Sequence, residues 1–302
     1  MNTRLQTLAA LLCLPLTLTA QPSKQVISIT EPRLNATVAA AAERDGTATQ
    51  MARVLESVKI QIETNLQATR RYELFAADPA AQAAINEAVG FNQSGLVDTS
   101  LNQAIEPFKA KGVEFVLLTQ ILDFQNLEEK SRVVGRTVTT RRIRLSAVSK
   151  IVSVERRTVV ESVDHTAEVG DLAQELDRVE ASGGSELDRL FLEAARDLGD
   201  KVANGFNERI SPARVLAVQG QFIMINRGEG TGIERGQKYE VMALGEEMFN
   251  PDTGESLGFA EFPVGMAEVV RVNPKFSQAR LVENFGVEKG AVVRLMIEEE
   301  NE

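Results

Sequence analysis

The chain has 302 residues, 43% of them hydrophobic, a formal net charge of −10 and a single cysteine. This acidic balance argues against free duplex nucleic acid as a partner, because binding to the phosphate backbone depends on Lys and Arg. The cysteine, Cys13, lies in the apolar amino-terminal stretch, so the remaining chain offers no disulfide and no thiolate metal site.

Residues 1–20 have the pattern of a secretory signal peptide. Arg4 precedes an apolar core, and the small Ala20 precedes a polar segment. Cys13 follows two leucines instead of a small residue, so we do not expect lipoprotein processing. We predict cleavage near Ala20 and a periplasmic protein. No later apolar run reaches the roughly 20 residues of a membrane-spanning helix, which leaves peripheral membrane association open.

The next part of the chain, residues 21–211, alternates strand and helix patterns. Apolar residues at helical spacing predict a helix of about five turns around residues 51–66, and a second helix covers 100–112 before the apolar strand 113–124. Two strand-like segments, 139–154 and 157–169, precede a long amphipathic helix that ends at Ile210. This order predicts an α/β sandwich.

Pro212 closes the helical half, and residues 212–297 read as short strands separated by turns. The strand-like segments are 214–220, 221–228, 237–244, 265–272, 276–283 and 291–297. We therefore predict a small all-β barrel or sandwich, followed by an acidic tail at 298–302. The overall fold class is α+β.

Glycines cluster in "NRGEGTGIERG", residues 226–236. The stretch lacks the Gly-Lys-Ser/Thr ending of a phosphate-binding loop, and Ile233 stands where a dinucleotide fingerprint needs its third glycine. Strand-like segments flank it, so we interpret it as a chain reversal. The "NPDTG" segment predicts a tight turn. The predicted turn residues are Gly228, Gly230, Gly232, Gly236, Pro251 and Gly254.

The element order resembles the periplasmic α/β domain of the CsgG family and TolB-like amino-terminal domains. "GVEFVLLTQILDF" is similar to that family's apolar strand ending in an aspartate, and "VQGQFIMINRGEGTGIERGQKYEVM" resembles the carboxy-terminal domain of FlgT, a flagellar assembly protein. These resemblances imply a role in envelope assembly. Pore formation is disfavoured, because "NLEEKSRVVGRTVTTRRIRLS" places polar Thr and Arg on both alternating faces.

Between residues 130 and 161, nine Lys or Arg stand against two Glu. Such a concentration in an acidic chain predicts a contact face for an acidic neighbour, although Lys and Arg also protect a solvated sheet edge from aggregation. Alternation along a strand puts Arg142 and Arg144 on one side and Arg141 on the other. The candidate interaction face comprises Arg141, Arg142, Arg144, Lys150, Arg156 and Arg157.

No catalytic or metal-binding pattern emerges, and we expect no cofactor. His165 is the only histidine; we interpret it as a solvated residue at a strand end, with a metal or acid–base pair with Glu168 as the alternative. The sequence predicts a non-enzymatic periplasmic scaffold or assembly protein whose partners are envelope proteins or further copies of itself. A ligand- or polysaccharide-binding module is the alternative function, and a hydrolase is the third.

Overall fold

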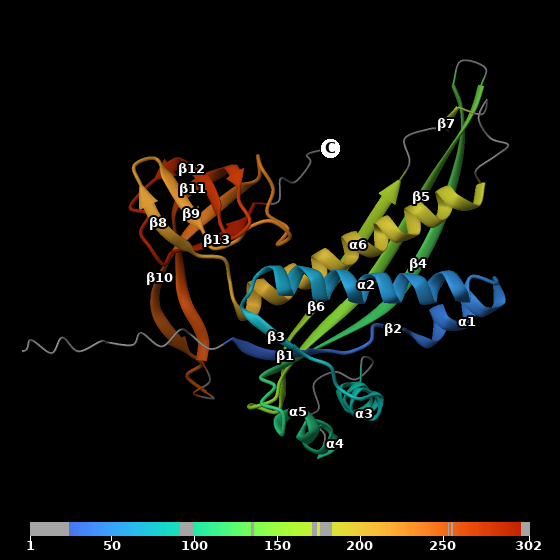
Figure 1. The fold of residues 1–302 in the computed structure, drawn as a ribbon, viewed down its shortest axis with the longest axis horizontal. Coiled ribbons are helices and arrows are strands. Elements are labelled where there is room, and N and C mark those ends of the chain that lie inside the picture. Colours follow the sequence, from blue (N-terminus) through green and yellow to red (C-terminus); the bar gives the residue numbers. More distant parts are fainter. Residues whose placement is uncertain are drawn as a thin grey trace, which may run out of the picture.

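The computed structural model describes residues 24–90, 99–133, 136–170, 174–175, 183–252, 254 and 256–296. The fold is α+β with two sheets, as predicted from the sequence (Figure 1). The proposed signal peptide and acidic tail lie outside the described residues.

The first sheet has the strand order β3-β1-β4-β5-β6. Strand β1 runs parallel to β3 and β4, whereas β4, β5 and β6 form an antiparallel meander. The two predicted segments 139–154 and 157–169 are β5 and β6. Its strands are β1 (Gln25–Ile29), β2 (Arg33–Leu34), β3 (Tyr72–Phe75), β4 (Phe115–Val133), β5 (Arg136–Ser153), β6 (Thr158–Gly170) and β7 (Gln174–Glu175).

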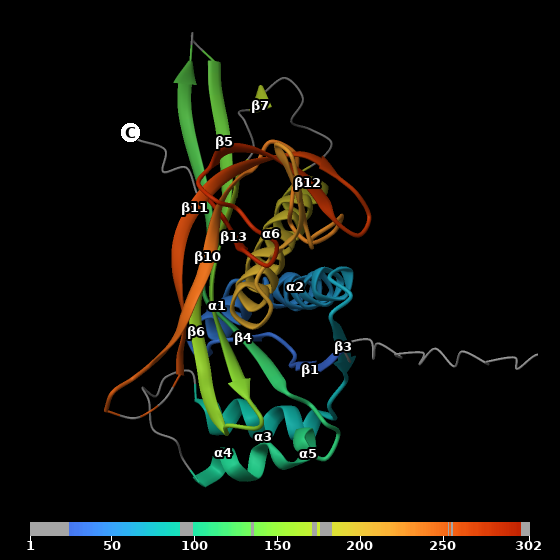
Figure 2. The same ribbon diagram turned by 90° about the vertical axis from the view of Figure 1, so that its left-hand side faces the viewer.

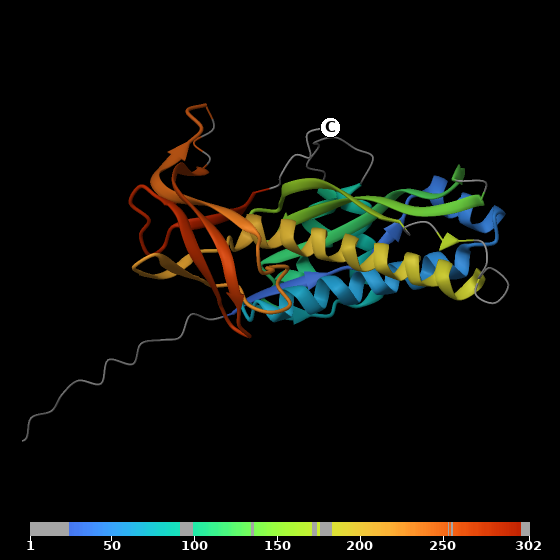
Figure 3. The same cartoon turned by 90° about the horizontal axis from the view of Figure 1, so that it is seen from above.

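Two long helices, α2 (Ala48–Ala68) and α6 (Gly183–Ile210), lie side by side across one face of this sheet (Figures 1 and 3). Both were predicted, because each carries an unbroken apolar stripe at helical spacing. Phe206 is fully buried there and packs edge-to-face on Tyr72, with ring centroids 5.5 Å apart. Burial of a ring of this size contributes about 1.5–3 kcal/mol.

The opposite face is covered only at one end, by three short helices (Figure 2). They are α3 (Pro79–Val89), α4 (Thr99–Ala104) and α5 (Glu106–Lys109). The single helix predicted over 100–112 is thus split in two, and Pro107 in the first turn of α5 explains the break, since it has no amide hydrogen to continue α4.

Helices α1 (Ala36–Arg44) and α3 were not predicted. Each begins at a side-chain cap: Asn35 accepts from the Val38 amide at 2.7 Å and Asp78 accepts from the Ala81 amide at 2.9 Å. Strand β4 also continues to Val133, nine residues beyond the predicted end, because β5 pairs with it along its whole length.

The second sheet has the order β13-β10-β11-β12-β9-β8 and is antiparallel throughout. It curls until its two edge strands meet at one bridge, Arg214 with Val292, without closing into a continuous barrel. The strands are β8 (Val215–Gln219), β9 (Phe222–Ile225), β10 (Lys238–Phe249), β11 (Ser256–Val272), β12 (Ser277–Asn284) and β13 (Val292–Leu295). Every strand predicted in this half is present.

The glycine-rich loop connects β9 to β10 and also contacts the helical half. A Cβ on Gly232 would lie 2.6 Å from Asn204 of α6, and one on Gly230 would lie 3.2 Å from Ala68 of α2. Both glycines have positive φ, +76° and +77°, which side chains rarely adopt. The loop therefore reverses the chain and also allows close packing against helices α2 and α6.

A buried arginine reinforces this junction. Arg227, 6% exposed, donates to the backbone carbonyl of Ser211, while Arg71 donates to the Ser211 hydroxyl. Burial, and then the nearby positive charge of Arg71, lower the pKa of Arg227 to about 10. The guanidinium stays charged at neutral pH, so the contact between the two halves contains a buried, hydrogen-bonded cation.

Candidate interaction surface

The helix-free part of the first sheet exposes a face that carries two of the predicted arginines. We call this the outer face and define it by Gln125, Leu127, Arg142 and Arg144, which pair across β4 and β5. Because Ile143 and Leu145 are fully buried under α2 and α6, their neighbours Arg142 and Arg144 project away from the helices. Arg141 lies on the helix side, as alternation along the strand requires.

Carboxylates from neighbouring strands partly neutralise these arginines. Arg141 lies 3.4 Å from Glu128 of β4, and Arg142 lies 3.7 Å from Glu168 of β6. Both pairs are exposed, so each contributes only about 0–1 kcal/mol and can exchange for an external partner. Glu168 also lies opposite Arg144 in the β5–β6 register, but in the described part of the chain no carboxylate lies within salt-bridge distance of Arg144, which is exposed.

The other three predicted residues lie at the far end of the sheet. Lys150 is separated from Arg144 by about 20 Å of strand. It donates to the Gly90 carbonyl at 2.9 Å, and burial lowers its pKa. Arg157 pairs with Glu106 of α5 at 3.6 Å, and Arg156 is exposed in the β5–β6 turn. The structure therefore divides the candidate face into two separate groups.

His165 is buried, not solvated as we interpreted it from the sequence. It lies within β6, 8% exposed, and its Nε2 is 2.8 Å from the Ser149 hydroxyl of β5. A Cβ on Gly205 would lie 3.1 Å from the ring, so α6 packs directly over it. Glu168, three residues along, projects to the opposite face. Within the described residues, no group of three or more His, Cys, Asp or Glu could hold a metal ion.

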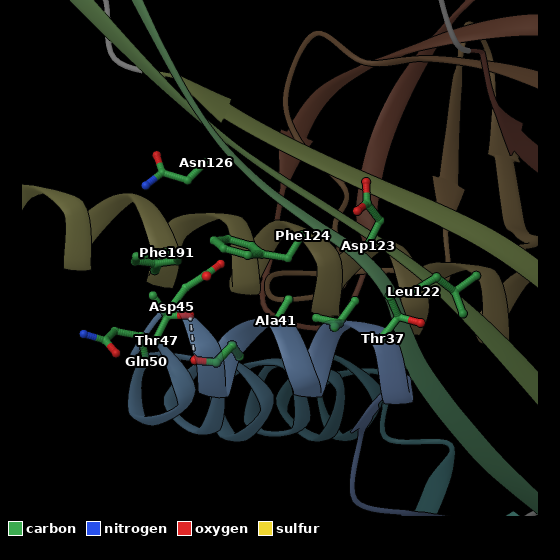
Figure 4. A pocket seen from close by; sticks show the side chains of 12 residues that line it. Thr37, Ala41, Asp45, Thr47, Gln50, Leu122, Asp123, Phe124, Asn126 and Phe191 are labelled. Atoms are coloured by element: carbon green, nitrogen blue, oxygen red, sulfur yellow. Dashed lines mark hydrogen bonds between the residues drawn. The ribbon is translucent and has the colours of Figure 1, made fainter.

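A cavity of about 430 Å³ opens between α1, α6 and β4 beyond the predicted face (Figure 4). Its walls include Phe124 and Phe191, with ring centroids 5.4 Å apart. Asp45, at the end of α1, and Asp123 supply carboxylates at its rim. A register shift between Ile121 and Asp123 interrupts β4 here, and such bulges redirect side chains.

Sequence reasoning missed a second exposed surface, on the hairpin of β10 and β11. Met248, Phe249, Phe259 and Phe262 are 46–58% exposed there. The available signal was the phenylalanines that flank the "NPDTG" turn on both sides. Gly254 closes that turn by donating to the Asn250 carbonyl at 2.8 Å.

Comparison with known proteins gives remote similarities. No family model matches the chain. An 83-residue stretch is 31% identical to an uncharacterized protein of Aquifex aeolicus, covering 28% of this chain and 17% of that protein. The match thus spans under a fifth of that relative's length.

Several solved structures are similar to the chain. They include a neuraminyllactose-binding hemagglutinin homolog from Helicobacter pylori (10% identity, TM-score 0.36, 62% of this chain and 87% of the other). A second example is a minor lipoprotein from Acinetobacter baumannii (11% identity, TM-score 0.31, 62% of this chain and 93% of the other). A third is lipoprotein GNA1162 from Neisseria meningitidis (18% identity, TM-score 0.21, 56% of this chain and 94% of the other). These neighbours are bacterial lipoproteins and a binding-protein homolog, and at such TM-scores they carry no argument about mechanism. The resemblance to CsgG and FlgT remains a prediction.

Among the described helices, none is long and apolar enough to cross a membrane.

Proposed function

We propose that this protein is a non-enzymatic scaffold or assembly component of the bacterial periplasm, working through protein contacts. The observation that carries the proposal is the outer face, where Leu127, 48% exposed, lies directly opposite Arg142 in the β4–β5 register. Exposed apolar groups bordered by charge are typical of protein-binding surfaces. The signal-peptide pattern of residues 1–20 and the resemblance to envelope assembly proteins support the location and the role.

The test is site-specific photocrosslinking in the bacterium that produces the protein. A photoreactive amino acid replaces Leu127 on the outer face, and a control replaces Ile60, which is 53% exposed on α2 and faces away from the sheet. We expect protein adducts from position 127 but not from position 60. Absence of adducts at position 127, or equal adducts at both positions, would remove the proposal.

A second candidate function rests on the α1–β4 cavity. Its volume of about 430 Å³ lies within the roughly 300–1,000 Å³ of small-ligand sites, and an aromatic wall beside carboxylates suits a polyhydroxylated ligand such as a saccharide. Calorimetric titration with oligosaccharides, on wild type and Phe124→Ala, checks it. Binding that the substitution abolishes would favour this function, and no heat in either protein would reject it.

A further inference from the structure

The β10–β11 hairpin is an apolar projection from an otherwise ordinary small β domain. It extends well beyond the other strands of the second sheet (Figures 1–3). Phe249 is 58% exposed, Phe259 51% and Phe262 57%, although burial of a phenylalanine ring is favourable. Three rings left in water on one projection indicate a surface that another molecule covers.

The rings lie on both sides of the hairpin. Phe259 pairs in register with Glu247 and Phe262 with Ala243; residues three apart on a regular strand project to opposite faces. The Phe262 ring lies over Gly245, where an added Cβ would come within 2.7 Å of it. Apolar rings are therefore exposed on both sides of the hairpin.

The charge of the hairpin restricts the partner. From Met242 to Val270 the sequence has six Asp or Glu and no Lys or Arg. Glu261 is engaged by Arg294 in a two-point salt bridge, at 2.6 and 2.7 Å, and Glu268 pairs with Arg280 at 3.2 Å. Glu246 and Asp252 are exposed. An anionic lipid surface would repel such a segment. The complementary surface must be apolar and cationic together.

The outer face of the same protein has that composition. Leu127 is 48% exposed, and Arg142 and Arg144 lie on the neighbouring strand. Glu168 of β6, which lies opposite Arg144 in the β5–β6 register, supplies one carboxylate to this face. Its pair with Arg142 is long, at 3.7 Å, and no carboxylate of the described residues lies within salt-bridge distance of Arg144.

We propose that the β10–β11 hairpin of one copy docks on the outer face of a second copy. This inference rests on the proposed function, since it names the occupant of the same face. The two surfaces belong to different halves of the chain, so the contact is heterologous and repeats from copy to copy. Such contacts give a closed ring when the rotation between copies closes and a filament when it does not.

The decisive experiment mixes two variants that each lose one half of the contact. Phe249→Ser with Phe259→Ser removes the hairpin's apolar surface, and Arg142→Glu with Arg144→Glu reverses the outer-face charge. In sedimentation velocity, we expect wild type to form species larger than a dimer, and each variant alone to associate about tenfold or more weakly. An equimolar mixture should form a dimer and stop there, because only one intact hairpin and one intact face remain.

Matched controls carry the same chemical changes elsewhere. Phe285→Ser alters an even more exposed ring, at 73%, and Arg156→Glu reverses a distant exposed charge. Both should associate as wild type does, and thermal melting of every variant confirms folding. High salt should weaken wild-type association, since exposed charges are screened.

Several outcomes would overturn the inference. They are a monomeric wild type, a mixture that stays monomeric, association that Phe285→Ser weakens equally, and hairpin-dependent flotation with anionic vesicles. Crosslinks from position 127 to a different protein, together with a monomeric wild type, would reject docking of a second copy while leaving the scaffold function standing. Self-association of the purified protein without any crosslinks from position 127 in the cell would reject the scaffold function while leaving docking of a second copy standing.

Discussion

Burial of His165 makes the stability of the protein depend on pH in a direction that the geometry determines. The ring is 8% exposed beneath α6. Burial lowers its pKa from 6.5 to about 4, with Lys201 lowering it further and Asp164 opposing the shift. As the pH falls, His165 is therefore protonated near pH 6.5 in the unfolded chain but only near pH 4 in the folded protein. Stability is complete above pH 6.5 and falls as the pH falls through this window.

The size of the effect follows from the same shift. Each tenfold change in proton affinity is worth about 1.4 kcal/mol, so the pKa shift of His165 corresponds to roughly 3 kcal/mol when fully expressed. At pH 4.5 most of it, about 2.5 kcal/mol, should already be lost. That is a sizeable part of the ~5–15 kcal/mol that stabilises a typical domain.

The assay is urea unfolding of wild type and His165→Gln from pH 7.5 to 4.5. Carboxylates titrate in both proteins, so the difference between the two curves isolates the histidine. We expect wild type to lose about 2.5 kcal/mol more than the variant over this range. Ser149→Ala is the control: it removes the hydrogen bond, costs about 1 kcal/mol and leaves the pH dependence in place. Parallel curves for wild type and His165→Gln would refute the reasoning.

Three further predictions concern the glycine loop and the junction between the two halves of the chain. Gly228→Ala should lower the free energy of unfolding by more than about 3 kcal/mol, because its Cβ would lie 2.6 Å from the rigid Asn273 carbonyl. Gly236→Ala has open space around the new Cβ but a φ of +90°, so it should lower this free energy by only about 1 kcal/mol. Chemical denaturation measures both. Gly232→Ala should expose the connection near residues 210–215 to protease, because the added methyl pushes Asn204 of α6 away. The carboxy-terminal half from residue 212 should fold when expressed alone, as circular dichroism and thermal melting would test.

The parts of the fold that the sequence revealed are those whose apolar pattern is continuous. Helix α2 was predicted because Met51, Val54, Val58 and Ile62, all fully buried, recur at helical spacing. Helices α1 and α3 were missed because they are rich in alanine, which marks no clear apolar stripe, and their signal lies in the polar caps Asn35 and Asp78.

The candidate site was less predictable, because charge balance depends on strand register. The nine basic residues were counted between residues 130 and 161. Glu128 and Glu168 lie outside this stretch, but they pair with Arg141 and Arg142. Pairing of β4 with β5 and of β5 with β6 brings these residues together across strands. No window along the chain reveals such pairs. The burial of His165 also follows from packing of α6 over β6, which a local pattern of alternating residues does not specify.

We expect the junction to set the geometry of any assembly of copies. The hairpin and the outer face lie on different halves, so their relative orientation depends on Gly230, Gly232 and Arg227 at the joint. If hairpin docking occurs, a junction variant such as Gly232→Ala keeps both surfaces intact and should still associate. It should, however, change the number of copies in a closed ring or convert a ring into open chains, because the rotation between copies changes. Light scattering after size-exclusion chromatography reads the copy number directly. An unchanged copy number in a variant with raised protease sensitivity would show that the junction does not set the assembly.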